Sequence, residues 1–176
     1  MQTDLTPETK LTPDGVAVYR VYYPETEVLG GFVQTLDNLT ENAQVLENGI
    51  VYGDAVISGN AVVRGEAWVH NAVVTDNAVV CDRAYVGQGS VVKDHAVVSG
   101  SAEVLLGSVI SGSALVTDNA QIVNSTVCDY AVIMGNSAVT NGAQVSEYAK
   151  VMDTAVIAAG ERNGITAARG NFAQLL

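Results

Sequence analysis

The chain has few of the residues that usually carry chemistry or fill a bulky core. Among its 176 residues are two cysteines, two histidines, one tryptophan and two phenylalanines, and aromatic residues make up 6% of the total. Two histidines do not match a zinc site of the carbonic-anhydrase kind, which takes three. With so few large side chains, any core must be built mainly from valine and alanine, which suits thin and regular packing.

Basic residues are also scarce, and long apolar segments are missing. Eight Lys and Arg stand against nineteen Asp and Glu, which gives a formal net charge of −11. An acidic surface repels nucleic acid and anionic membranes, so neither is expected as a partner. No apolar run approaches the roughly 20 residues of a membrane-spanning helix. Met1–Lys10 is polar and acidic, unlike a signal peptide, so we expect synthesis in the cytoplasm.

What the chain does have is a six-residue repeat that extends from residue 42 to residue 157. The reference position recurs every six residues and holds Val or Ile in nineteen of twenty repeats, and a small residue, usually Ala, stands two positions earlier. We count twenty repeats, with one residue skipped after Val69 and another after Cys128. In this count Cys128 occupies an inward position, whereas Cys81 follows an inward residue and is predicted to point outward. A disulfide between the two cysteines is not expected.

The repeat predicts short β-strands rather than helices. The small and aliphatic positions lie two residues apart, as on one face of a strand, and the pattern has no 3.6-residue component. Pairs such as Gly53-Asp54 and Asp76-Asn77, which tolerate the backbone angles of tight turns, separate successive strands. Three such strands make one three-sided coil. The sequence therefore predicts an all-β parallel β-helix of about six to seven coils.

Two flanking segments lack the repeat. Residues 1–41 contain turn signals at Thr6-Pro7 and Thr12-Pro13 and a predicted strand from Val16 to Tyr23. We interpret residues 1–41 as an N-terminal β cap, residues 42–157 as the β-helix and residues 158–176 as a C-terminal cap. Both ends of a β-helix expose unpaired strand edges, so a cap or a partner is expected at each.

The pattern aliphatic–x–x–x–small–x resembles the hexapeptide repeat of left-handed parallel β-helices, and the left hand is implied by this resemblance alone. Gly30-Gly31-Phe32-Val33, followed by Asn38-Leu39 and by repeats that begin Asn-Ala, is similar to a narrower group. These are the YdcK-like β-helix proteins of enterobacteria, phages and prophages, often labelled transferases without a demonstrated reaction. The hexapeptide signal is specific for the fold and says little about function.

Many hexapeptide proteins are acyltransferases, and that resemblance implies an acyl-CoA donor, a small acceptor and a histidine base at a cleft between subunits. The candidate bases are His70, predicted to face outward, and His95, at a corner beside Asp94. Adjacent side chains point apart, corners commonly carry polar residues, and no protruding loop interrupts the repeats. We therefore favour a protein without catalytic residues, cofactor or metal, and keep the acyltransferase as the alternative.

The residue before each inward position is expected to face outward, and these residues form three outer faces. On two faces they are aliphatic in five consecutive coils. One predicted ladder consists of Val62, Val79, Val97, Leu115 and Val132, and the other of Val56, Val73, Val91, Val109 and Val127. The β-propensity of Val explains part of this pattern, but contiguous apolar stripes are uncommon on soluble monomers. Two apolar faces beside one mixed face predict a homotrimer.

The functional hypotheses follow from these surfaces. The favoured one is a structural assembly module, encoded by a phage or prophage, that associates with itself and with other virion proteins. Besides the acyltransferase, a second alternative is a binding module. It would use Trp68 and Tyr85, on the third face, to stack against a carbohydrate or to contact a protein.

Overall fold

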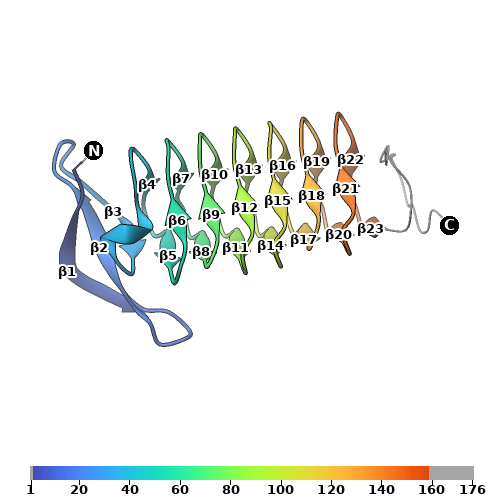
Figure 1. Ribbon diagram of the computed structural model, residues 1–176. Coiled ribbons are helices and arrows are strands. Elements are labelled where there is room, and N and C mark those ends of the chain that lie inside the picture. The colour runs from blue at the N-terminus through green and yellow to red at the C-terminus, as the bar shows by residue number, and fades with distance from the viewer. Residues whose placement is uncertain (1, 159–176) are drawn as a thin grey trace.

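Short parallel strands wind into a solenoid with a hairpin at its N-terminal end. The computed structural model describes residues 2–158, and in it the strands from β4 to β23 stack in about seven turns (Figure 1). Each turn contributes one strand to each of three flat faces, and equivalent strands of successive turns pair in parallel. The predicted all-β parallel β-helix is thereby confirmed.

We name the three faces by the number of strands in their sheets. The seven-strand face consists of β4 (Gln44–Val45), β7 (Val62–Val63), β10 (Val79–Val80), β13 (Val97–Val98), β16 (Leu115–Val116), β19 (Val132–Ile133) and β22 (Lys150–Val151). The six-strand face consists of β6 (Val56–Ile57), β9 (Val73–Val74), β12 (Val91–Val92), β15 (Val109–Ile110), β18 (Thr126–Val127) and β21 (Gln144–Val145).

The third sheet, the ten-strand face, includes the N-terminal segment. Its solenoid strands are β5 (Ile50–Tyr52), β8 (Trp68–His70), β11 (Tyr85–Gly87), β14 (Glu103–Leu105), β17 (Gln121–Val123), β20 (Ala138–Thr140) and β23 (Val156–Ala158). At its N-terminal edge follow β3 (Val28–Val33), β2 (Ala17–Tyr23) and β1 (Asp4–Leu11). In each turn the chain passes from the seven-strand to the ten-strand and then to the six-strand face.

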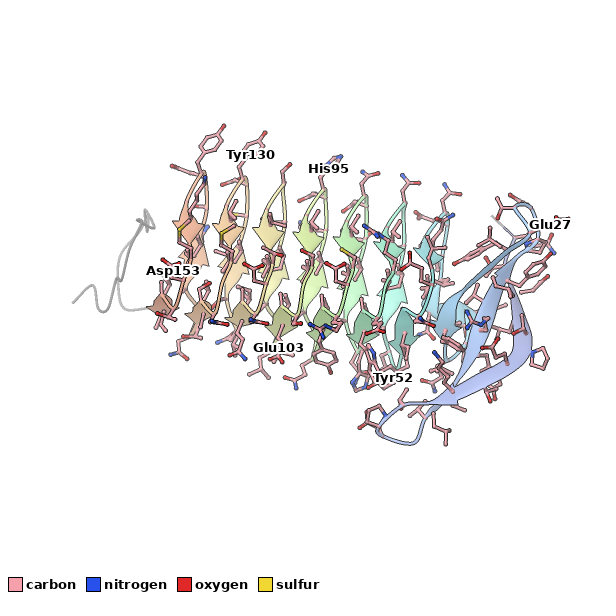
Figure 2. All side chains as sticks on the ribbon, turned by 180° about the vertical axis from the view of Figure 1, so that it is seen from behind. Glu27, Tyr52, His95, Glu103, Tyr130 and Asp153 are labelled. Atoms are coloured by element: carbon pink, nitrogen blue, oxygen red, sulfur yellow. The ribbon has the colours of Figure 1, made fainter. Side chains whose placement is uncertain are left out.

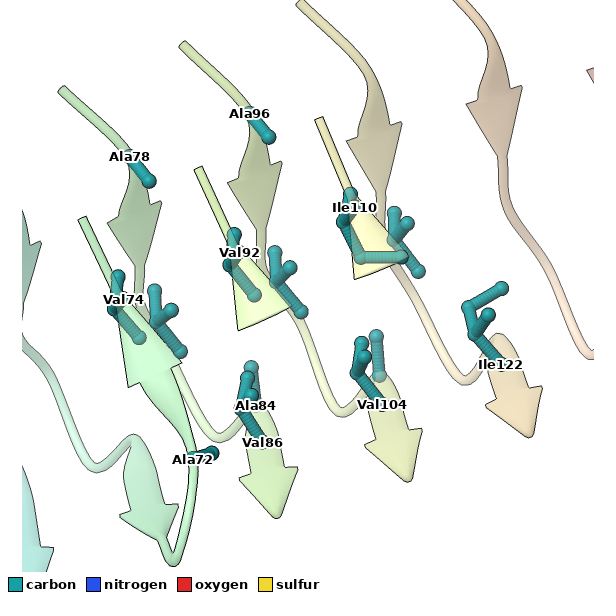
Figure 3. Close-up of a cluster of buried hydrophobic side chains, with 14 of the residues drawn as sticks. Ala72, Val74, Ala78, Ala84, Val86, Val92, Ala96, Val104, Ile110 and Ile122 are labelled. Carbon is teal, nitrogen blue, oxygen red and sulfur yellow. The ribbon is translucent and has the colours of Figure 1, made fainter. Parts of the chain in front are cut away.

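The interior is a ladder of small aliphatic side chains (Figure 3). Each strand buries one Val or Ile, and all twenty are between 0 and 9% exposed. They are Val45, Val51, Ile57, Val63, Val69, Val74, Val80, Val86, Val92, Val98, Val104, Ile110, Val116, Ile122, Val127, Ile133, Val139, Val145, Val151 and Ile157. Complete burial of one such side chain contributes about 1.5–3 kcal/mol. Repeated turn after turn, this ladder is the main source of stability.

The structure places the second skipped residue one repeat earlier than predicted. Ile110 pairs with Val127 and Val109 with Thr126, so Val127 points inward and is 0% exposed. The predictions that Val127 faces outward and that Cys128 faces inward are therefore wrong. A slip of one residue exchanges the two faces of a strand. The correct register buries Val127, with Ser125 in the small position, instead of Cys128.

Both skipped residues fall at the corner between the ten-strand and six-strand faces. One shortens the connection from Val69 to Val74 and the other that from Ile122 to Val127. Asn71 and Asn124 turn the chain there with positive φ angles of 50° and 47°. A corner absorbs the missing residue without reversing the strands that follow it.

The two cysteines are free, although their surroundings differ from the prediction. Cys81, expected to point outward, is buried, and Cys128 is only partly buried. Burial raises the pKa of both thiols. Both are therefore held in the protonated form, which is the poorer nucleophile.

Acidic residues and glycines alternate along the corner between the seven-strand and ten-strand faces. From the first turn to the last the residues are Glu47, Gly65, Asp82, Gly100, Asp118, Gly135 and Asp153, all with positive φ. The Asp82 carboxylate accepts the Gly100 N–H at 3.0 Å, and the Asp118 carboxylate accepts the Gly135 N–H at 2.9 Å. Alternation also separates successive carboxylates by two turns, about 9–10 Å, which weakens their repulsion.

The N-terminal segment provides hydrogen-bond donors to the open end of the solenoid. Backbone N–H groups bond to carbonyl groups of the following turn, so the carbonyls of the earliest turn need donors from elsewhere. The Asn38 side chain, at the end of the short 3-10 helix η1 (Leu36–Asn38), donates to Gly53 O at 3.1 Å and Ala55 O at 2.8 Å. The Tyr23 hydroxyl donates to Val45 O at 3.1 Å.

Two sequence predictions for the flanking segments can be located. The strand expected from Val16 to Tyr23 is present as β2, whereas the turn expected at Pro7 lies inside β1, where the register shifts between Leu5 and Thr9. Proline is tolerated there because β1 is the outermost strand of its sheet. The C-terminal cap predicted for 158–176 lies, beyond Ala158, outside the described residues.

Replacing Gly100 by Ala should destabilise the fold more than replacing Gly89 by Ala. Both glycines have positive φ, 66° and 78°, but a Cβ at Gly100 would lie 2.7 Å from Asp118 N, whereas one at Gly89 meets nothing within 4 Å. We expect the excess loss for Gly100→Ala to be about 1–3 kcal/mol, measured by denaturant unfolding of both variants. Equal losses would contradict a close contact between turns.

Candidate functional site

The outward aliphatic ladders lie on the two faces where they were predicted. Outward Val91 pairs with Val73 and Val109, and outward Val97 pairs with Val79 and Leu115. Because Val127 faces inward, the six-strand ladder comprises four residues, from Val56 to Val109, and Thr126 follows it. The seven-strand ladder keeps all five, between Gln44 and Lys150. At about 4.8 Å per turn they extend roughly 14 and 19 Å.

These outward side chains are partly covered even in the single chain. Every aliphatic member of both ladders is intermediate in exposure, since its neighbours in the turns above and below cover its flanks. What remains open is the outer surface of each ladder, a continuous apolar strip along a rigid face.

The two ladder faces meet at one corner, which we call the shared corner. Tyr130 and Tyr148 project from it in successive turns with their rings stacked at 5.1 Å and 5°. They are 57% and 77% exposed, which is unusual for large aromatic side chains. Figure 2 shows Tyr130 and His95 on the same edge of the solenoid, opposite Tyr52 and Glu103. The two stacked rings are the apolar part of this corner, which carries polar pairs such as Asp76-Asn77 and Asp94-His95 in earlier turns.

The two candidate bases lie on different parts of the solenoid. His95 is exposed at the shared corner, where the Asp94 carboxylate accepts the Gly112 N–H at 2.8 Å. His70 lies on the ten-strand face and stacks on Tyr52 at 4.1 Å and 3°. No side chain among residues 2–158 hydrogen-bonds either imidazole, so neither has the orienting partner of a general base. Within the same range no group of three or more His, Cys, Asp and Glu could hold a metal.

The N-terminal hairpin reaches over the first turns of the ten-strand face (Figure 1). At its tip the Asp14 carboxylate accepts the Tyr52 hydroxyl at 3.1 Å. Under it, Tyr52 meets Trp68 edge to face at 6.2 Å and 83°. Ile50, Tyr52, Val18 and Phe32 form a second, small apolar cluster there. The sequence predicted only a cap for this segment, although the turn signal at Thr12-Pro13-Asp14-Gly15 marked the tip.

A cleft of about 510 Å³ opens between the end of β1 and the corner beside the ten-strand face. Its lining includes Trp68, Lys10, Asn48, Glu66 and Arg83. Of the two aromatic residues predicted to contact a ligand, Trp68 therefore borders a cleft. Tyr85 pairs with Trp68 in the next turn, but its ring folds over Gly87, where a Cβ would lie 2.8 Å from the hydroxyl oxygen.

Comparison with known proteins does not assign a function. The sequence matches no protein-family model, and no curated protein matches it. In the part of the chain that the structure describes, no helix is long and apolar enough to span a membrane. The surfaces themselves are therefore the basis for a functional proposal.

The Tyr52 phenol should ionise only at high pH. Burial, and then the hydrogen bond to Asp14, raise its pKa to about 12. Because a tyrosine in the unfolded chain ionises near 10, this contact stabilises the fold below about pH 10 and its contribution is lost between pH 10 and 12. The tyrosinate absorbance of the native chain minus that of Tyr52→Phe isolates this titration.

The Asp14→Asn variant tests whether the Asp14 carboxylate contributes to the raised pKa of Tyr52. It should lower the pKa of Tyr52 while leaving the phenol buried, because the negative charge beside it is removed. A pKa near 10 for Tyr52 in the native chain would show that the hairpin tip does not close over this face in solution.

Proposed function

We propose that the chain is a non-catalytic structural module that assembles with copies of itself through its two aliphatic ladders, as a homotrimer. We also propose that it winds with the left hand of the hexapeptide-repeat proteins that its sequence resembles. The observation that carries the proposal is the pair of ladders on two adjacent faces. Its rigid, repetitive shape suits a scaffold or attachment role in a larger assembly.

The third face serves as an internal comparison for the ladders. Glu103 and Gln121 occupy outward positions of the ten-strand face that are equivalent to Val91 and Val97. The same strand geometry therefore accepts charged and polar residues there. β-propensity applies equally to all three faces, so it does not explain why only two of them carry unbroken aliphatic runs. Burial against another chain explains the difference.

The positions of the two faces favour a closed ring. A chain that presents one ladder face to one neighbour and the other to a second neighbour makes heterologous contacts, and the smallest closed ring of this kind is a trimer. In this ring the shared corner lies along the symmetry axis, where Tyr130 and Tyr148 would be covered by their copies. The hairpin, on the ten-strand face, stays outside the contact.

The proposed setting is a virion or a related particle. Its support is the similarity of the segment from Gly30 to Leu39 to β-helix proteins of phages and prophages, together with the rigidity of a solenoid whose turns are hydrogen-bonded throughout. The positions of the two histidines do not support the acyltransferase alternative. His70 lies on the ten-strand face and His95 at the shared corner, and neither imidazole has a carboxylate partner.

Val91→Asp should separate the assembly into folded monomers. Light scattering of the native chain should give about three times 18.3 kDa, whereas the variant should give 18.3 kDa with an unchanged circular dichroism spectrum. Gln121→Asp, at an equivalent outward position of the ten-strand face, is the control and should stay trimeric. Val92→Asp, which buries a charge in the interior, should unfold the chain.

The mass of the native protein in solution distinguishes a trimer from a monomer, a dimer or a larger ring. A monomer at micromolar concentration would overturn the assembly proposal. A dimer or a larger ring that Val91→Asp disrupts would keep the ladders as contacts and would overturn the threefold arrangement.

Association should strengthen as salt is added. Each chain carries a net charge of −11, so three chains repel one another, and salt screens that repulsion while leaving apolar contacts intact. Sedimentation equilibrium at low and at moderate ionic strength measures the change in dissociation constant. Weaker association in salt would indicate that ion pairs, rather than aliphatic ladders, hold the chains together.

A further inference from the structure

We propose that the cleft between β1 and the ten-strand face binds a saccharide that carries a carboxylate, such as a uronic acid unit. The cleft lies on the face that the proposed assembly leaves free. The proposal does not depend on the trimer and is tested separately from it. The cleft has a volume of about 510 Å³ and is wide open to solvent, so a ligand there would stay partly exposed and bind weakly.

Trp68 gives the cleft its aromatic surface. It is the only tryptophan of the chain and is partly exposed. Tyr52 meets it edge to face at 6.2 Å, and it packs against the apolar cluster under the hairpin. The indole is therefore held in place before a ligand arrives, so little side-chain entropy is lost on binding. A flat aromatic surface of this kind suits the C–H face of a pyranose ring.

Two basic side chains give the cleft its preference for an anion. Lys10 and Arg83 are two of only eight basic residues in an acidic chain. The Lys10 ammonium lies 4.1 Å from the centre of the Phe32 ring and donates to Asn48 Oδ1 at 3.4 Å, which fixes its position. The Arg83 guanidinium is exposed and makes no hydrogen bond or ion pair with any residue in the range 2–158. Its donors are free to bind a carboxylate in bidentate geometry.

The remaining polar groups select against other anions. Glu66 adds a negative charge to the same lining, which lowers the attraction of the two basic side chains for a densely charged ligand such as a polyphosphate or a nucleic acid. A sugar with a single carboxylate places its charge at Arg83 and offers hydroxyl groups to Glu66 and to the Asn48 amide. Aromatic stacking, one carboxylate and several hydroxyl groups together describe an acidic sugar.

The single tryptophan makes the test direct, since its fluorescence and its indole N–H resonance report on the cleft alone. We would titrate the full chain with methyl glucuronide and with methyl glucoside, which differ only in the carboxylate. Saturable changes at Trp68 with the glucuronide, at millimolar concentration and clearly stronger than with the glucoside, are the expected result. No change with either sugar would overturn the proposal.

Arg83→Gln should weaken glucuronide binding about tenfold, as expected for loss of a charge-assisted hydrogen-bonding partner, and should leave any glucoside binding unchanged. Lys93→Gln makes the same change of charge on a different face and should have no effect. Equal affinity of native and Arg83→Gln chains would exclude Arg83 as the carboxylate ligand and overturn the assignment. If a short glutamate-rich peptide bound more tightly than the glucuronide, the ligand of the cleft would be an acidic protein segment and the saccharide proposal would be wrong.

Discussion

The narrow interior of the solenoid is the constraint on which the rest of the structure depends. It admits one β-branched side chain and one small side chain from each strand, and every strand from β4 to β23 obeys this limit. The chain must therefore turn after every few residues, which requires positive φ angles at the corners. The outward positions are less constrained by this interior, and on the seven-strand and six-strand faces their aliphatic residues are the basis of the proposed contacts between chains.

The sequence was sufficient to predict the fold because every repeat meets this constraint with the same pair of inward residues, one small and one aliphatic. It predicted nineteen of the twenty inward positions and the faces on which the ladders lie. It misplaced Val127 and Cys128 because a skipped residue can be assigned to either of two neighbouring corners when the turn residues are similar. Choosing Ser125 and Val127 would have kept Val or Ile at every inward position, and that signal was present.

The cleft could not have been predicted in the same way. It joins Lys10, from a strand without the repeat, to Asn48, Glu66 and Arg83, which occupy one corner of three successive turns. Periodicity places the last three together, but the path of the hairpin depends on contacts such as that between Asp14 and Tyr52. The separation of surfaces is likewise a property of the three-dimensional structure: two faces meet at the Tyr130–Tyr148 corner, and the third holds the hairpin and the cleft.

In the proposed assembly the outward ladders of one chain contact those of another. An isotope-filtered nuclear Overhauser measurement tests it most directly, in an assembly mixed from chains with labelled and unlabelled valine methyl groups. We expect cross-peaks between chains that connect Val91 of the six-strand face with Val79 and Val97 of the seven-strand face, and none at Val156 of the ten-strand face. An absence of cross-peaks at Val91 and Val97, or contacts confined to Val156, would contradict it.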